Sequence, residues 1–74
     1  MKIAIEFKNH KEEYIKKLEG SGFFSSSSLK AIWIYGVRVI YTNHNKLVLE
    51  SEKEYYKMVE IDFKDMEYFE IHKS

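Results

Sequence analysis

Apolar and polar residues alternate along most of this chain, which is the pattern of β-strands that bury one face. In the first such segment Ile3, Ile5 and Phe7 share one parity and alternate with mostly charged residues. We therefore expect the chain to begin with a strand.

A short helix is expected next. Asn9 lies three residues before Glu12, the spacing of a capping box, so Asn9 is the predicted N-cap. Tyr14 and Leu18 then fall on one apolar stripe, and Gly20 stands where a left-handed residue is needed after a helix.

Residues 20–28 contain two glycines and four consecutive serines around Phe23 and Phe24. This composition predicts a surface loop with an apolar anchor. A phosphate-binding loop would need glycines spaced to open a helix, followed by Lys-Ser or Lys-Thr, and the segment has neither.

A long β-rich segment runs from Lys30 to Thr42, and both of its faces are partly apolar. Gly36 in its middle predicts a bulge or a bend that would exchange the two faces halfway. Residues 43–45 tolerate positive φ and the apolar pattern resumes at Leu47, so we expect a hairpin with a short loop.

Two further strands are predicted, one through Val59 and Ile61 and one through Phe69 and Ile71. The predicted fold class is therefore α+β, a small antiparallel or mixed sheet of about five strands with one helix, in the order βαββββ. A helix beginning near Ser51 is the alternative for the fourth strand. The expected core consists of Ile5, Leu18, Trp33, Val39, Val59 and Ile61.

The length of 74 residues predicts a single domain, residues 1–74, with a marginal core. There is no cysteine, which leaves self-association or a bound partner as support and is typical of a reducing cytoplasm. The N-terminal segment is too short and too charged for a signal peptide or a membrane span, so we expect a cytoplasmic protein that does not bind a membrane.

The formal net charge is zero but unevenly distributed. Residues 1–48 carry eight Lys or Arg against four Glu, whereas residues 49–74 carry eight Asp or Glu against four Lys. Because proteins dedicated to nucleic acid are normally basic, this balance counts against such a protein. Attraction between the two halves within the fold is the alternative explanation.

No group of residues predicts catalysis. His10, His44 and His72 lack the close spacing of zinc ligands, so we expect no metal and no other cofactor. Glu60 and Asp62 share a strand face, but period two places all residues of one parity there. We therefore expect that the protein is not an enzyme.

The second face of the predicted sheet is unusually apolar, and one short helix cannot cover both faces. It would display Ile32, Ile34, Ile40, Val48, Tyr56, Met58 and Tyr68 among Glu54, Glu60, Asp62 and Glu70. Tyr and Met are enriched at protein interfaces, and carboxylates favour a partner with a basic surface. We expect a protein partner to bind at Tyr56, Met58, Glu60, Asp62, Tyr68 and Glu70. The alternatives are a homodimer through this face and plain burial of the face within the fold, against the loop at Phe23 and Phe24.

Nucleic-acid binding is an alternative of a different class. Residues 35–41, Tyr-Gly-Val-Arg-Val-Ile-Tyr, resemble the longer strand motif of the RNA-recognition fold, whose sheet aromatics stack on bases. In this alternative the protein is a small nucleic-acid-binding or RNA-cleaving domain that uses Lys30, Tyr35, Arg38 and Tyr41. Residues 45–71 also resemble the terminal strands of small bacterial pleckstrin-homology-like domains.

The favoured function is that of a non-enzymatic protein that docks on another protein and inhibits or modulates it. In size, in its composition rich in Lys, Glu, Ile and Tyr, and in its lack of catalytic groups, the chain resembles the small inhibitors that phages encode against host or defence machinery. This resemblance implies a viral protein that acts in the host cytoplasm.

Overall fold

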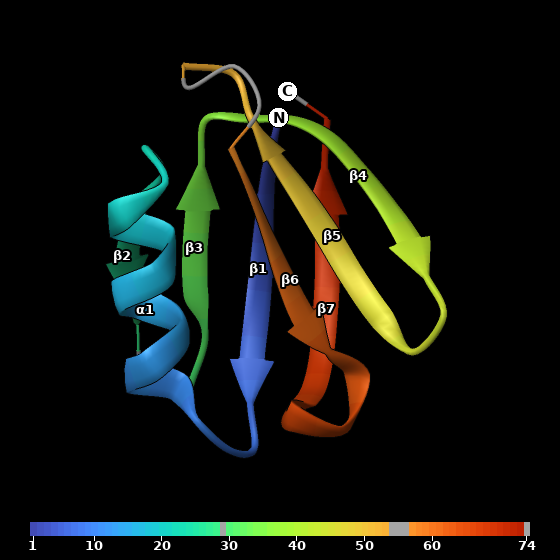
Figure 1. The fold of residues 1–74 in the computed structure, drawn as a ribbon. Coiled ribbons are helices and arrows are strands. Elements are labelled where there is room, and N and C mark those ends of the chain that lie inside the picture. Colours follow the sequence, from blue (N-terminus) through green and yellow to red (C-terminus); the bar gives the residue numbers. More distant parts are fainter. Residues whose placement is uncertain (29, 54–56, 74) are drawn as a thin grey trace.

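The computed structural model describes residues 1–28, 30–53 and 57–73. In these residues the elements follow the order β1 (Lys2–Phe7), α1 (Lys11–Gly20), β2 (Phe24–Ser27), β3 (Ile32–Tyr35), β4 (Val37–Asn43), β5 (Lys46–Ser51), β6 (Met58–Asp62), the 3-10 helix η1 (Phe63–Asp65) and β7 (Met66–His72) (Figure 1). The predicted α+β class is confirmed, and the order is roughly the predicted βαββββ. The described strands number seven rather than five, because one predicted strand is divided into two and one strand forms in a predicted loop.

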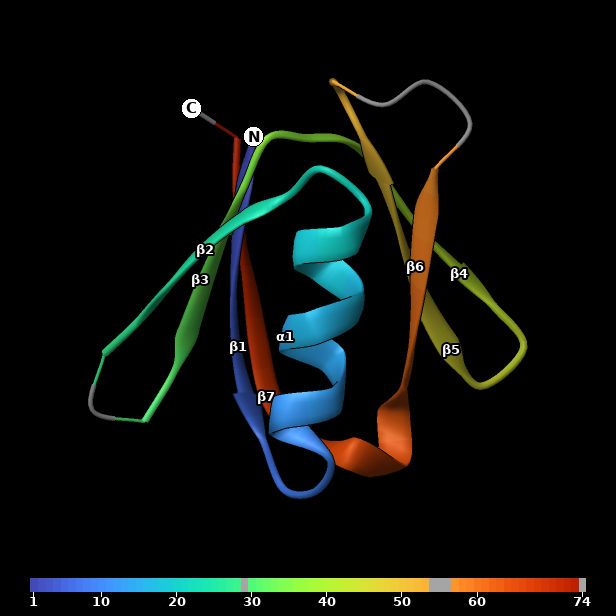
Figure 2. The same ribbon diagram turned by 60° about the vertical axis from the view of Figure 1, so that its left-hand side comes forward.

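The strands form two antiparallel sheets, one of order β2-β3-β1-β7 and one of order β4-β5-β6. Figure 2 shows α1 lying between the two sheets. Tyr14 and Leu18 of the helix join one apolar cluster with side chains from the inner faces of both sheets. The outer faces of the two sheets therefore point away from each other.

The predicted long strand from Lys30 to Thr42 is two strands in different sheets. Gly36 separates β3 from β4 and has a φ of +76°, a conformation that glycine adopts without a side-chain clash. Ile32 and Ile34 are buried before it, and Val37 is buried after it, so the buried parity changes at the glycine as predicted. The bend carries the chain from one sheet to the other.

The predicted loop at residues 20–28 contains strand β2, which pairs with β3 from Phe24↔Tyr35 to Ser27↔Ile32. Serines have low β-propensity, but backbone hydrogen bonds to a neighbouring strand do not depend on the side chain. The sequence prediction of a loop is therefore wrong for these four residues.

Both ends of α1 differ from the prediction. The N-cap is His10, at φ 61°, one residue beyond the predicted Asn9, and it makes no side-chain capping bond. Gly20 is the last helical residue, and the left-handed position is Gly22. There the Phe23 and Gly22 amides donate to the carbonyl oxygens of Leu18 and Glu19, which is the bonding pattern of a Schellman motif.

The remaining predicted strands are confirmed in outline. β4 and β5 form the predicted hairpin, with His44 at φ 58° in its turn. Residues 58–62 are the strand β6, not a helix. Glu54 and Tyr56 lie outside the described residues.

Four of the six predicted core residues are buried, namely Ile5, Leu18, Val59 and Ile61. Trp33 and Val39 are half-buried instead, on the outer faces of β3 and β4. Trp33 lies between the buried Ile32 and Ile34, and a bulge between Val37 and Val39 shifts the parity of β4. Ile32, Ile34 and Val48, which the alternation predicted on the displayed face, are buried.

Candidate binding surface

The residues predicted to bind a partner are divided between two surfaces. Met58, Glu60 and Asp62 alternate with the buried Val59 and Ile61, so they lie on the outer face of β6. Tyr68 and Glu70 lie on the outer face of β7, in the other sheet. Because the two outer faces point in opposite directions (Figure 2), these five residues do not form one contact surface. Tyr56 lies outside the described residues.

The residues predicted to bind nucleic acid are also separated. Tyr35 lies on the outer face of β3, whereas Tyr41 lies on the outer face of β4, in the other sheet. Arg38 lies at the β4 bulge and forms an ion pair with Glu50. Lys30 is exposed between β2 and β3. The segment that resembles the RNA-recognition motif therefore does not form one strand.

The outer face of the four-stranded sheet carries Phe24, Trp33, Tyr35 and Tyr68, and we call these four residues the aromatic face. Trp33 and Tyr35 point outward because Ile32 and Ile34, on the other parity of β3, are buried in the core. Phe24 of β2 lies opposite Tyr35 in the strand register. Tyr68 lies on β7, at the opposite edge of the same sheet.

The aromatic face exposes large rings. The exposed fractions are 59% for Phe24, 51% for Tyr68 and 38% for Tyr35, and Trp33 is half-buried. The helix packs against the inner side of this sheet, and no described element covers the outer side (Figure 1). An uncovered group of aromatic side chains on a small protein is a typical mark of an interaction site.

Cations lie over the rings at the β2–β3 side of this face. The Lys2 ammonium is 5.1 Å from the centre of the Trp33 ring and 6.0 Å from that of Tyr35, and the Lys53 ammonium is 4.1 Å from the centre of the Phe24 ring. These are cation–π distances, and they hold the two lysines on the aromatic face.

The β7 side of the aromatic face is acidic. Tyr68 donates a hydrogen bond to Glu70, and this bond lowers the pKa of Glu70 and raises that of Tyr68. His72 Nε2 lies 2.6 Å from Glu70 Oε1 but outside hydrogen-bond geometry, so the two make an ion pair only when His72 is protonated. Glu6 of β1 lies opposite Tyr68 in the register, which places Tyr68 near two carboxylates.

On the outer face of the three-stranded sheet, charged side chains are paired with one another across the strands. Tyr41 and Met58 are exposed there, but Lys46 pairs with Glu60 at 3.3 Å and Arg38 pairs with Glu50. Cross-strand ion pairs of this kind are typical of a solvated sheet face. This face is therefore the weaker candidate for a docking surface.

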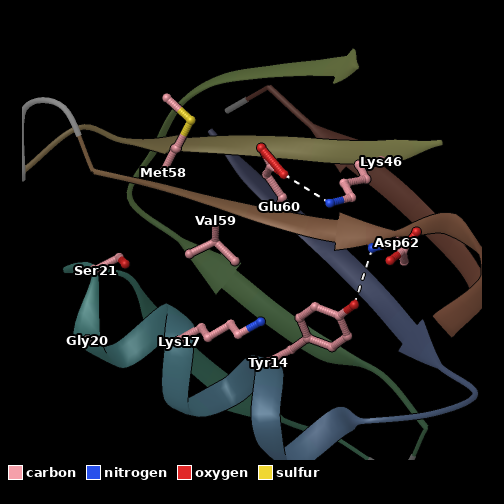
Figure 3. Close-up of a pocket in the computed structure, with 9 residues that line it drawn as sticks. All are labelled: Tyr14, Lys17, Gly20, Ser21, Lys46, Met58, Val59, Glu60 and Asp62. Atoms are coloured by element: carbon pink, nitrogen blue, oxygen red, sulfur yellow. Dashed lines mark hydrogen bonds and ion pairs between the residues drawn. The ribbon is translucent and has the colours of Figure 1, made fainter. Parts of the chain in front are cut away.

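An open groove of about 410 Å³ lies between α1 and β6 (Figure 3). Tyr14, Lys17, Gly20 and Ser21 line it from the helix side, and Met58, Val59, Glu60 and Asp62 line it from the strand side, with Lys46 next to them. Its volume is within the range of ligand pockets, roughly 300–1,000 Å³.

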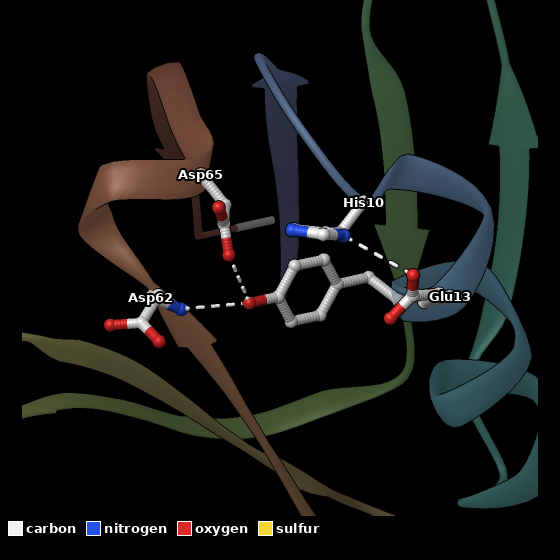
Figure 4. Close-up of polar contacts among 5 residues, drawn as sticks. His10, Glu13, Asp62 and Asp65 are labelled. Carbon is white, nitrogen blue, oxygen red and sulfur yellow. Dashed lines mark hydrogen bonds and ion pairs between the residues drawn. The ribbon is translucent and has the colours of Figure 1, made fainter.

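A buried polar cluster lies beneath one end of this groove (Figure 4). The Tyr14 hydroxyl donates to Asp65 Oδ2 at 2.7 Å and accepts from the Asp62 amide at 3.3 Å. Burial first, and the hydrogen bond to Asp65 second, raise the pKa of Tyr14. A phenol that holds its proton more tightly is a poor nucleophile or base at neutral pH, so this cluster fits a structural role.

Sequence reasoning missed Phe24, Trp33 and Lys2 as surface residues. Phe24 was expected to anchor a loop, and Trp33 was expected in the core. The sequence does contain one signal: if Gly36 exchanges the two faces, Ile32 and Ile34 point inward and Trp33 must point outward.

The chain matches no protein-family model, and neither the comparison with curated proteins nor that with solved structures finds a match. Among the described residues, no three His, Cys, Asp or Glu side chains are grouped so as to hold a metal ion. Their one α-helix is too short and too polar to cross a membrane.

Proposed function

We propose that this protein is a non-enzymatic binding protein that docks its aromatic face on another protein and inhibits or modulates it. The observation that carries the proposal is the set of four aromatic side chains, Phe24, Trp33, Tyr35 and Tyr68, on one uncovered sheet face. The resemblance in size and composition to phage-encoded inhibitors extends the proposal to a host or defence protein as the target.

The composition of this face supports binding energy that is concentrated in few residues. Trp and Tyr are the residue types most often found as interface hot spots, where the loss of one side chain costs about 2 kcal/mol or more. The β-sheet fixes the backbone at all four residues before binding, so little backbone conformational entropy is lost when a partner docks.

The charges around the rings indicate what the partner would present. Tyr68 lies near Glu6 and Glu70, so a basic patch on the partner fits this side. Lys2 and Lys53 are at the other side and fit carboxylates. Rim charges act mainly on the association rate, whereas buried aromatic anchors act on dissociation.

Capture of a partner from a bacterial lysate, after the mass in solution has been measured, tests the proposal. With the captured partner, Phe24→Ala and Tyr68→Ala are each expected to speed dissociation about 30-fold, which corresponds to about 2 kcal/mol. Replacement of Glu6 and Glu70 by Lys is expected to slow association and weaken its dependence on salt.

Tyr41→Ala is the matched control, because Tyr41 is a similarly exposed tyrosine on the opposite sheet. Its binding should be unchanged, as should that of the double variant Glu60→Lys, Asp62→Lys. If these control substitutions weaken binding and the aromatic-face substitutions do not, the partner binds the outer face of the three-stranded sheet. If the mass shows a stable dimer that Tyr68→Ala dissociates, the aromatic face is a homodimer interface instead.

Single-stranded nucleic acid is the second candidate, and the lysines over the rings of Trp33 and Phe24 are the observation that favours it. Two carboxylates on the same face and the zero net charge weigh against it. Trp33 is the single tryptophan, so its fluorescence reports directly on this face. Quenching by a ten-residue oligo(dT) that weakens steeply with salt and is lost in Lys2→Glu would favour nucleic acid over protein.

A further inference from the structure

Strand β6 is an edge strand of the three-stranded sheet, and its free edge faces α1. Two backbone bonds fix which of its residues pair with β5. The Ser51 amide donates to the Lys57 carbonyl, and the Phe63 amide donates to the Asn45 carbonyl. Antiparallel pairing alternates, so Val59 and Ile61 also bond to β5, while the backbone groups of Met58, Glu60 and Asp62 point to the free edge.

Only one of these three outward amides has a partner in the described part of the chain. The Asp62 amide donates to the Tyr14 hydroxyl at 3.3 Å. The amides and carbonyls of Met58 and Glu60 make no bond to another described residue. They have the spacing by which an additional strand would pair with β6.

The helix is held beside this edge without covering its middle. At one end the Tyr14 hydroxyl bridges to the Asp62 amide, and at the other end the Lys57 ammonium donates to the Gly20 carbonyl at 3.3 Å. Between the two bridges lies the groove of about 410 Å³ shown in Figure 3. The unpaired backbone of Met58 and Glu60 therefore borders an open space.

The charge in this groove indicates the chemistry of its occupant. Figure 3 shows the Lys17 ammonium directed from the helix toward the space beside β6. The ammonium lies 5.4 Å from the centre of the Tyr14 ring, and it forms no ion pair with a described carboxylate. Lys46, the other lysine of the groove, is already paired with Glu60. The second carboxylate of the lining, Asp62, lies at the Tyr14 end of the groove, where Figure 3 shows it away from the Lys17 ammonium. A carboxylate on the occupant would complete the site at Lys17.

We propose that this groove binds an extended acidic peptide segment of a partner protein, which pairs with the free edge of β6 and places a carboxylate at Lys17. In this binding mode the backbone bonds supply affinity and the side-chain contact supplies specificity. The groove lies between α1 and β6 and shares no residue with the aromatic face on the outer side of the four-stranded sheet, so the inference stands independently of the proposed function.

Hydrogen exchange of the backbone amides tests the pairing. The probe is the blocked pentapeptide Ser-Val-Glu-Val-Ser at millimolar concentration, followed by NMR. The amides of Met58 and Glu60 should exchange quickly in the free protein and at least tenfold more slowly with peptide. Those of Val59 and Ile61 are already bonded to β5 and should change little. The same peptide with methylated backbone nitrogens should give no protection.

Reversal of charge tests the role of Lys17. Lys17→Glu should weaken binding of the glutamate peptide at least tenfold and should create binding of Ser-Val-Lys-Val-Ser. Lys16→Glu is the matched control, since Lys16 is exposed on the same helix but does not line the groove. It should leave binding of both peptides unchanged.

Three results would overturn the proposal. The first is no protection of Met58 and Glu60 by millimolar peptide. The second is equal binding of the methylated peptide, which would mean that the β6 backbone is not used. The third is protection that appears without peptide and rises with protein concentration, which would assign the β6 edge to a second copy of this chain.

Discussion

At the scale of single residues, Asp65 is the one buried residue with a charged side chain among those that the structure describes. It is 4% exposed, and its carboxylate accepts the bond from the Tyr14 hydroxyl. Its backbone carbonyl accepts the Lys8 amide at 2.7 Å and the Asn9 amide at 3.3 Å. One residue therefore ties η1 to the helix and to the segment after β1, and a buried carboxylate is tolerated only because it is bonded.

Tyr14→Phe should destabilise the protein by about 1–3 kcal/mol, because it removes one hydroxyl and leaves Asp65 Oδ2 buried without a donor. Urea unfolding measures this difference. Tyr68→Phe is the control, since that hydroxyl is bonded to Glu70 on the exposed surface, and it should change stability by less than about 0.5 kcal/mol. Equal losses in the two variants would contradict the structural role of the buried bond.

The same hydroxyl predicts a dependence of stability on alkaline pH. Burial, and then the bond to Asp65, raise the pKa of Tyr14 above its ordinary value of 10.0 in the folded protein. As the pH rises above 10.0 the unfolded chain loses this proton first, so the free energy of unfolding should fall until the folded pKa is passed. Unfolding in urea at pH 8, 10 and 11 should show the fall in the parent and in the surface variant Tyr41→Phe, and a smaller fall in Tyr14→Phe.

At the scale of elements, Gly36 decides how the chain is distributed between the two sheets. It joins β3 to β4 at φ +76°, and its carbonyl accepts the Glu52 amide at 2.9 Å. A Cβ at this position would meet nothing closer than Glu52 Cγ at 4.0 Å. Space is therefore available, and the backbone conformation alone opposes any other residue.

Gly36→Ala should lower the free energy of unfolding by about 1 kcal/mol, because alanine at positive φ is strained. Gly20→Ala is the control: Gly20 ends α1, no atom lies within 4 Å of an added Cβ, and alanine favours a helix. Chemical denaturation should show the control unchanged or slightly more stable. A tolerated Gly36→Ala would mean that the junction adopts another conformation in solution.

The sequence predicted the elements that have strong local patterns. The β4–β5 hairpin followed from its turn residues, and the exchange of faces followed from Gly36. Strand β2 could not be predicted, because its serines pair through backbone bonds to β3 and carry no apolar alternation. The aromatic face could not be predicted either, since Phe24 and Tyr68 are brought onto one sheet only by the strand order β2-β3-β1-β7.

At the scale of the whole molecule, one apolar cluster holds both sheets and the helix together. The basic and acidic halves of the sequence meet in the pairs Arg38–Glu50 and Lys46–Glu60, but both pairs are largely exposed. Exposed ion pairs contribute roughly 0–1 kcal/mol each. Stability therefore depends mainly on the buried side chains, and the total for 74 residues is expected to be about 4–11 kcal/mol.

Val59→Asp should remove most of that stability. Val59 is 4% exposed within the apolar cluster, so an aspartate there would be buried without a partner, at a cost of several kcal/mol. Its neighbour Met58 has the opposite parity and is exposed, so Met58→Asp should leave the fold nearly unchanged. In a thermal scan followed by circular dichroism, Val59→Asp should be unfolded at 25 °C or melt at least about 15 °C lower, whereas Met58→Asp should melt close to the parent. A lower melting temperature for Met58→Asp than for Val59→Asp would show that β6 presents its other face to the helix. The backbone amides and carbonyls of Met58 and Glu60 would then not border the groove.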